Sequence, residues 1–257
     1  MTAQPAEKNL PARFVFTGRV HPERAQVSIN LPGRKCTIID KGCGISGEMS
    51  TDISCSQICV IYSSETGVVD ILTLKNAVED AIRLQLDILG YVLGCGYDAE
   101  ITQAIALDTH EKHVFGVGIP VIEQRKNQNF EQILNLFNVD ESDYLRRCLA
   151  DLREAVKTPK DTGEFCYRAI ETLRKFFAQQ NGLDDNKRDE CNKSWEILRN
   201  ELVVERKELD EIAVFAVDIR HGGTMLITSD NRARIFGLTW DIVDKFIAYA
   251  KNGYKRK

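Results

Sequence analysis

One short stretch of the chain carries two side chains that could act on a phosphate. In "FAVDIRHGGTMLIT" (residues 215–228), Arg220 and His221 stand side by side in front of two glycines. A histidine can move a proton near neutral pH, and an arginine can stabilise the charge that develops on a phosphate. Arg220 and His221 are therefore the candidate catalytic residues.

The same stretch also has a purely structural interpretation, which the sequence leaves open. A histidine in the last turn interacts favourably with the negative end of the helix dipole, and Gly222 or Gly223 can end the helix in the left-handed conformation. This interpretation says less about why an arginine precedes the histidine. If the Arg220 side chain points inward, it needs an acidic partner such as Glu171 or Asp218.

Three further motifs have the residue spacing of a cofactor or metal site, but the residues around them do not fit such a site. The segment "GCGISG" has the G-x-G-x-x-G spacing of a dinucleotide-binding loop, but "EMSTDIS" is too short and too polar to be the helix that must follow. His110 and His113 in "HEKH" stand between two strand-like runs, where an exposed turn is expected rather than a metal site. Cys55 and Cys59 have C-x3-C spacing without a second matching pair. We therefore expect no cofactor and no metal.

The composition is that of a folded protein without a strongly basic half. The 257 residues are 43% hydrophobic and 28% charged, and a chain of this length accommodates two domains. Before Asp140 the chain has 12 Lys and Arg against 16 Asp and Glu, and from Asp140 onward it has 22 of each, which gives the net charge of -4. Nonspecific nucleic-acid binding usually needs a marked basic excess. Any contact with RNA therefore has to be local.

The distribution of apolar residues argues against a secreted or membrane protein. The first residues, "MTAQPAEKNLPAR", lack the apolar core of a signal peptide, and the most apolar stretch, 72–95, contains five charged residues. We therefore expect a cytoplasmic protein with no membrane partner, whose eight cysteines are reduced thiols. Cys148, Cys166 and Cys191 occupy apolar helix positions and are expected in the core.

The first half has the pattern of a sheet covered by one long helix. Four β-rich runs, "RFVFTGRV", "RAQVSINL", "RKCTIID" and "SCSQICVIYSS", predict antiparallel strands with one covered face. From Ile71 to Val92 apolar residues recur at helical spacing, and "GCGYD" ends the helix. The runs "AEITQAIALD" and "HVFGVGIPVI", joined by "THEK", predict two more strands. Residues 1–120 should thus form an α+β domain, and 121–140 a linker with a short helix, "FEQILNLF".

The second half changes from a period of two to a period of 3.6 residues. The last predicted helix has the widest apolar stripe, and Ser229 or Asp230 can cap its first turn. Residues 141–257 are therefore expected to form an all-α bundle with short connections. Its five predicted helices cover 141–157, 163–180, 188–205, 208–221 and 229–251.

This second half resembles a known superfamily. The segments "CYRAIETLRKFF", "SWEILRNEL", "DIRHGG" and "TWDIVDKFIAYA", in this helical order, resemble the HEPN superfamily of prokaryotic helical domains, and more closely bacterial proteins with an "RHG" stop between the last two helices. The resemblance covers residues 141–252. It implies a homodimer through the helical bundle, metal-independent RNA cleavage in active members, and a setting in phage defence or toxin–antitoxin systems.

The chain departs from the catalytic motif of that superfamily. The motif is an arginine separated by four to six residues from a histidine, which acts on the 2′-hydroxyl or the leaving group. None of the four histidines of this chain has an arginine five to seven positions before it. Arg220 matches the arginine, but Met225 or a neighbour stands where the histidine is expected. His221 could replace it only at an unwound helix end, because adjacent helical residues point about 100° apart.

Three interpretations of function follow. The first is a non-catalytic or regulatory protein whose HEPN-like bundle serves dimerisation and the binding of a partner or a nucleic acid. The second is a metal-independent ribonuclease toxin that uses Arg220 and His221. In the third, the N-terminal sheet binds a small molecule and the bundle reports it. We favour the first, because the catalytic motif is incomplete.

Overall fold

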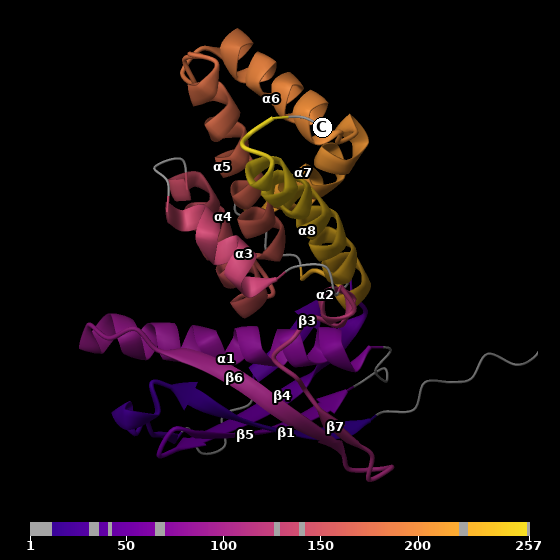
Figure 1. Cartoon of the computed structure of the whole chain (residues 1–257). Coiled ribbons are helices and arrows are strands. Elements are labelled where there is room, and N and C mark those ends of the chain that lie inside the picture. The colour runs from indigo at the N-terminus through magenta and orange to yellow at the C-terminus, as the bar shows by residue number, and fades with distance from the viewer. Residues whose placement is uncertain are drawn as a thin grey trace, which may run out of the picture. The chain divides into compact units, whose positions relative to one another are not determined.

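The chain divides into two compact units, unit 1 (Met1–Val117) and unit 2 (Gly118–Lys257). The computed structural model describes residues 12–30, 36–40, 43–64, 70–125, 129–138, 142–220 and 226–255. Unit 1 is a sheet with one long helix, and the described elements of unit 2 are all helices (Figure 1). This confirms the predicted fold class, an α+β domain followed by a five-helix bundle. That residues 121–140 act as a linker stays a prediction.

The sheet of unit 1 is antiparallel throughout its described strands. Its strands are β1 (Arg13–His21), β2 (Ile29–Asn30), β3 (Cys36–Asp40), β4 (Ile45–Ser54), β5 (Gln57–Ser64), β6 (Asp98–Ala106) and β7 (Lys112–Val114). They run in the order β2-β4-β5-β1-β6-β7, and β3 also pairs with β4. Helix α1 (Ile71–Leu93) lies over one face of the sheet (Figure 1). Along β5 buried and exposed residues alternate, as predicted for a sheet with one covered face.

Strand β4 is the strand that the sequence did not predict. Ile45, Met49 and Ile53 are buried on one side of it, although most of the residues between them are polar. The predicted run "SCSQICVIYSS" is interrupted by a tight turn at Cys55 and Ser56, whose φ angles are 48° and 64°. Ser56 is buried, and its Oγ accepts a hydrogen bond from the Val27 N–H at 3.0 Å. This bond holds the turn without a glycine.

Two other predicted strands are shorter than expected. "RAQVSINL" contributes only β2, because Glu23–Ala25 forms a 3-10 helix. "HVFGVGIPVI" contributes only His113 and Val114 to β7, and its last three residues belong to a short helix, α2 (Pro120–Glu123). The glycine-rich segment lies between β3 and β4, and Gly47 stands inside β4, where a Cβ would lie 2.5 Å from the Tyr62 Oη. Within the described residues 43–64 the segment leads into a strand, whereas a dinucleotide-binding loop leads into a helix.

The helices of unit 2 agree closely with the predicted ones. Apart from α2, which lies in a predicted strand, they are α3 (Phe130–Leu134), α4 (Ser142–Lys157), α5 (Thr162–Gln180), α6 (Arg188–Leu202), α7 (Arg206–Arg220) and α8 (Ser229–Lys251). The cap of α8 is Thr228, whose side chain accepts from the Asn231 N–H, rather than the predicted Ser229 or Asp230. None of the described helices has the length and apolarity that a membrane span needs.

The core of unit 2 contains two of the three cysteines predicted there. Cys148 and Cys166 are fully buried, and burial raises the pKa of both thiols, whereas Cys191 is only partly buried. Helices α5 and α7 approach each other closely at Gly163, where a Cβ would lie 2.6 Å from the Cβ of Phe215 and 2.9 Å from its carbonyl carbon. Only glycine therefore fits this crossing of the two helices.

Candidate functional site

The predicted catalytic pair lies at the limit of what the structure describes. Helix α7 ends at Arg220, close to the predicted end. The Arg220 side chain, His221 and the two glycines that follow lie outside the described residues. The catalytic role of Arg220 and His221 therefore stays a prediction.

The other histidines are surface residues of unit 1. His110 follows the turn after β6, and His113 lies on the short strand β7, as expected for a hairpin. The His21 Nε2 lies 3.2 Å from the Glu100 Oε2, and both side chains are more than two-fifths exposed. Within the described ranges, no three His, Cys, Asp or Glu side chains are grouped so that they could hold a metal ion.

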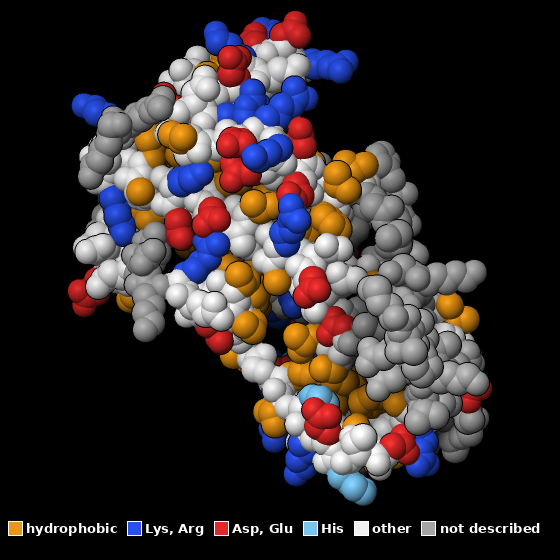
Figure 2. Space-filling view, turned by 90° about the vertical axis from the view of Figure 1, so that its right-hand side faces the viewer, with side chains coloured by type: hydrophobic (Ala, Val, Ile, Leu, Met, Phe, Trp, Pro, Cys, Tyr) orange, Lys and Arg blue, Asp and Glu red, His pale blue; other side chains and the backbone are white. Residues whose placement is uncertain are grey.

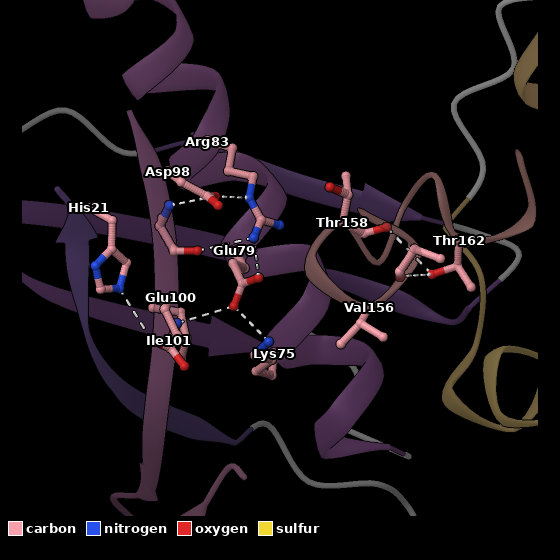
Figure 3. A network of polar contacts seen from close by, with 12 residues as sticks. His21, Lys75, Glu79, Arg83, Asp98, Glu100, Ile101, Val156, Thr158 and Thr162 are labelled. Carbon is pink, nitrogen blue, oxygen red and sulfur yellow. Dashed lines mark hydrogen bonds and ion pairs between the residues drawn. The ribbon is translucent and has the colours of Figure 1, made fainter. Parts of the chain in front are cut away.

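A first cluster of charged side chains joins α1 to the edge of β6. Glu79 is only 3% exposed, and its Oε2 lies 2.6 Å from the Lys75 Nζ and accepts from the Ile101 N–H at 3.1 Å. Its Oε1 lies 2.7 Å from Arg83, which also donates to Asp98 at 2.9 Å and to the Ala99 carbonyl oxygen at 3.0 Å (Figure 3). Burial by itself would lower the pKa of Arg83. The charges of Glu79 and Asp98 and their hydrogen bonds with Arg83 have the larger combined effect, so the pKa of Arg83 is raised.

This first cluster is a structural tie rather than a binding site. Both carboxylate oxygens of Glu79 are buried and already have partners inside the protein. Glu79 and Arg83 satisfy main-chain groups of β6 at Ile101 and Ala99. Such groups would otherwise be unpaired at a strand edge, where they attract other strands.

A second cluster, in unit 2, is built around the buried Arg174 of α5. Arg174 is 1% exposed, and its guanidinium forms two hydrogen bonds with the Asp185 carboxylate and one with the Ser194 Oγ at 2.8 Å. The hydrogen bond from Arg174 lowers the pKa of Asp185. The guanidinium carbon also lies 5.4 Å from the centre of the Trp195 ring, within the range of a cation–π contact. Arg174 thus fixes the start of α6 and the position of Trp195.

Beside this cluster lies a cavity of about 330 Å³ between α5, α6 and α7. Trp195 contributes to its wall, and the Trp195 and Tyr167 rings have centroids 5.9 Å apart. One side of α6 and one side of α7 face the cavity. The lining residues of each helix recur three or four positions apart, and this spacing follows one side of a helix. The cavity is lined by Tyr167, Asn192, Trp195, Arg199, Arg206, Leu209, Asp210 and Ala213.

The two arginines of the cavity differ in their partners. Arg206 is highly exposed and pairs with Asp210 at 3.4 Å. Arg199 is partly buried, and within the described part of unit 2 its guanidinium has neither an ion pair nor a hydrogen bond. A partly buried cation next to two aromatic rings suits a ligand that carries both a negative group and a planar ring. We call the side chains of Trp195, Arg199 and Tyr167 the Arg–Trp site.

Both units match domains of one protein family. Residues 14–115 match the N-terminal domain, and residues 130–251 the C-terminal domain, of a domain of unknown function, DUF8168. The chain belongs to the DUF8168 family. The Arg–Trp site lies within the C-terminal DUF8168 domain. No curated protein and no solved structure matches the chain.

Little in the amino-acid pattern points to the Arg–Trp site of this DUF8168 domain. Trp195 has the spacing of an ordinary core residue, and Arg199 that of an ordinary solvent-facing one. The available signal was the four-residue step from Trp195 to Arg199, followed after a short connection by Arg206. That step places an aromatic ring and a cation on one side of a helix.

Proposed function

We propose that the protein is a non-catalytic, regulatory binding protein whose helical unit binds single-stranded RNA at the Arg–Trp site. A base would stack on Trp195 and Tyr167, and a backbone phosphate would pair with Arg199. The observation that carries this proposal is the position of Arg199, a partly buried cation in a cavity next to aromatic rings.

The chemistry of the cavity favours a nucleotide unit over other ligands. Stacking of a base on an aromatic side chain contributes about 1–3 kcal/mol and tolerates any base. Arginine pairs with phosphate in a geometry that matches two of its N–H groups. Bases stacked inside a duplex cannot reach such rings, so the single strand is the form that fits.

The mixture of charges in unit 2 supports a local contact rather than a long basic groove. On the face drawn in Figure 2, the basic side chains of the helices alternate with acidic ones. The equal numbers of acidic and basic residues from Asp140 onward agree with this picture. A protein of this kind contacts few phosphates, so its affinity should depend on salt only moderately.

The resemblance to HEPN domains supplies the remaining parts of the proposal. From it we propose a cytoplasmic protein that acts in phage defence or in a toxin–antitoxin system. The homodimer through the helical bundle that the resemblance implies stays a prediction. The order and length of the five helices, α4 to α8, are compatible with that resemblance. The genes next to this one test the biological setting.

Replacing Arg199 by alanine should weaken RNA binding about tenfold and reduce the salt dependence by about one phosphate contact. The reason is that one charge-assisted contact is lost while the stacking rings remain. Fluorescence anisotropy with a labelled single-stranded RNA, repeated over a series of salt concentrations, measures both effects. A labelled RNA hairpin in the same assay should bind less well than the single strand.

The matched control is Arg188→Ala, which removes the same charge from an exposed position on the same helix. This variant should bind RNA like the unmodified protein. Equal binding by R199A and R188A, or no binding of the unmodified protein at low salt, would refute the proposed site.

A separate experiment decides between the binding protein and the ribonuclease interpretation. We expect the purified protein, incubated with total RNA and a metal chelator, to leave the RNA intact, because its catalytic motif is incomplete. Cleavage that disappears in the Arg220→Ala/His221→Ala double variant would replace our proposal by the ribonuclease interpretation. Unfolding of both proteins adds a second readout, since loss of a helix cap alone should cost about 1 kcal/mol.

A further inference from the structure

Helix α1 has an apolar face that unit 1 leaves uncovered. Leu84, Ile88, Tyr91 and Val92 are 62%, 59%, 90% and 70% exposed. Their spacing of four, three and one residues places them on one side of the second half of the helix. We call these four side chains the α1 face.

In the second half of the helix, the α1 face lies opposite the side that is already packed. There Ile82, Leu86 and Gly90 are buried and follow one another at intervals of four residues. A helix with a single covered side is expected to be polar elsewhere. Here α1 carries a second apolar row, which indicates a second packing partner.

The size of the α1 face is that of a contact between proteins. From the exposed fractions, its four side chains present roughly 500 Å² of apolar surface, which is near the upper end for the largest patch of a typical monomer. Two such faces packed together would bury roughly 1,000 Å², about the minimum for a specific interface. A second copy of the chain therefore supplies enough area.

Charge and spacing also favour a second copy. From Leu84 to Cys95 the only charged residue is Asp87, so the face offers little to a strongly charged partner and does not repel its own kind. Leu84 and Val92 stand four residues on either side of Ile88. An antiparallel pair related by a two-fold axis at Ile88 would place Leu84 of one copy against Val92 of the other.

We infer that the protein forms a homodimer in which the α1 faces of two copies pack against each other, independently of the Arg–Trp site and of the helical bundle. Sedimentation velocity of the full chain over a series of concentrations tests this. The unmodified chain should pass from monomer to dimer as its concentration rises. Ile88→Glu should weaken the dimer roughly thirtyfold or more, because each interface contains the buried charge twice.

The control is Val214→Glu, which places the same charge at a 67% exposed valine of α7. It should dimerise like the unmodified chain, and circular dichroism should show that the unmodified chain and all its variants are folded. A monomer at every concentration of the unmodified chain overturns the inference, whatever else the face binds. A dimer that persists in both Ile88→Glu and Tyr91→Lys also overturns it, because the contact then lies elsewhere.

Discussion

Replacing Glu79 by alanine is expected to destabilise unit 1 by about 3–5 kcal/mol, the range for breaking a buried ion pair from one side. The carboxylate is 3% exposed and holds Lys75, Arg83 and the Ile101 N–H at once. Without it, the positive charges of Lys75 and Arg83 are no longer neutralised. The Ile101 N–H of β6 also loses its acceptor. Glu79→Gln keeps an acceptor for Ile101 but not the charge, so its loss should be smaller.

Hydrogen exchange followed by mass spectrometry measures this effect within the full chain. The amides of α1 and β6 should exchange faster in E79A. Asp87→Ala, which removes an exposed acid from the same helix, is the matched control and should change stability by less than about 0.5 kcal/mol. Unchanged exchange at Ile101 in E79A would mean that Glu79 does not tie the helix to the strand.

Replacing Asp185 by asparagine should destabilise unit 2 by about 3 kcal/mol, because the Arg174 guanidinium then stays buried without its carboxylate. Arg174→Ala should cost a similar amount, about 2–4 kcal/mol, through the cavity that it leaves and the lost bond to Ser194. Both changes also release Trp195, so they should weaken RNA binding, provided that the Arg–Trp site binds RNA.

Lowering the pH should remove the stabilisation by the Arg174–Asp185 pair in the unmodified protein. The hydrogen bond from Arg174 holds the pKa of Asp185 below its usual value. The pair therefore stabilises the folded state fully above the pKa of an unfolded aspartate, about 3.9, and this contribution is lost as the pH falls through the lowered folded value. D185N should lack that part of the pH dependence.

Tryptophan fluorescence separates these effects from those at Glu79. The chain has two tryptophans, Trp195 and Trp240, and both lie in unit 2. Denaturation monitored by their emission should shift to lower denaturant concentration in D185N and R174A and stay in place in E79A. A D185N protein as stable as the unmodified one at neutral pH would contradict the importance assigned to this pair.

The helices were predictable because each repeats one strong local pattern many times. All five helices of the bundle begin and end within a few residues of the expected positions, since apolar residues recur there over three turns or more. Strand β4 was not predictable from pattern alone. Its apolar residues are separated by Ser, Glu, Thr and Asp, and its pairing with β5 is decided by neighbours in the sheet rather than by local preference.

The charged clusters and the Arg–Trp site were less predictable than the helices, because they depend on contacts between separate elements. In the sequence, Glu79 is one of the five charges that interrupt the apolar stretch 72–95, and its burial depends on Lys75 and Arg83 one turn away on either side. Arg199 and Trp195 are unremarkable until α5 and α7 enclose the space beside them. Sites that are assembled from three helices leave no continuous motif in the sequence.

The contact at Gly163 bears on how this family could diversify. Because α5 meets the main chain of α7 there, the angle between the two helices is set by backbone against backbone. Relatives can then exchange Tyr167, Arg206 or Asp210 without altering the frame around them. New ligand preferences would arise by substitutions on a fixed scaffold, and evolution would tolerate change along the wall of the cavity far more readily than at Gly163.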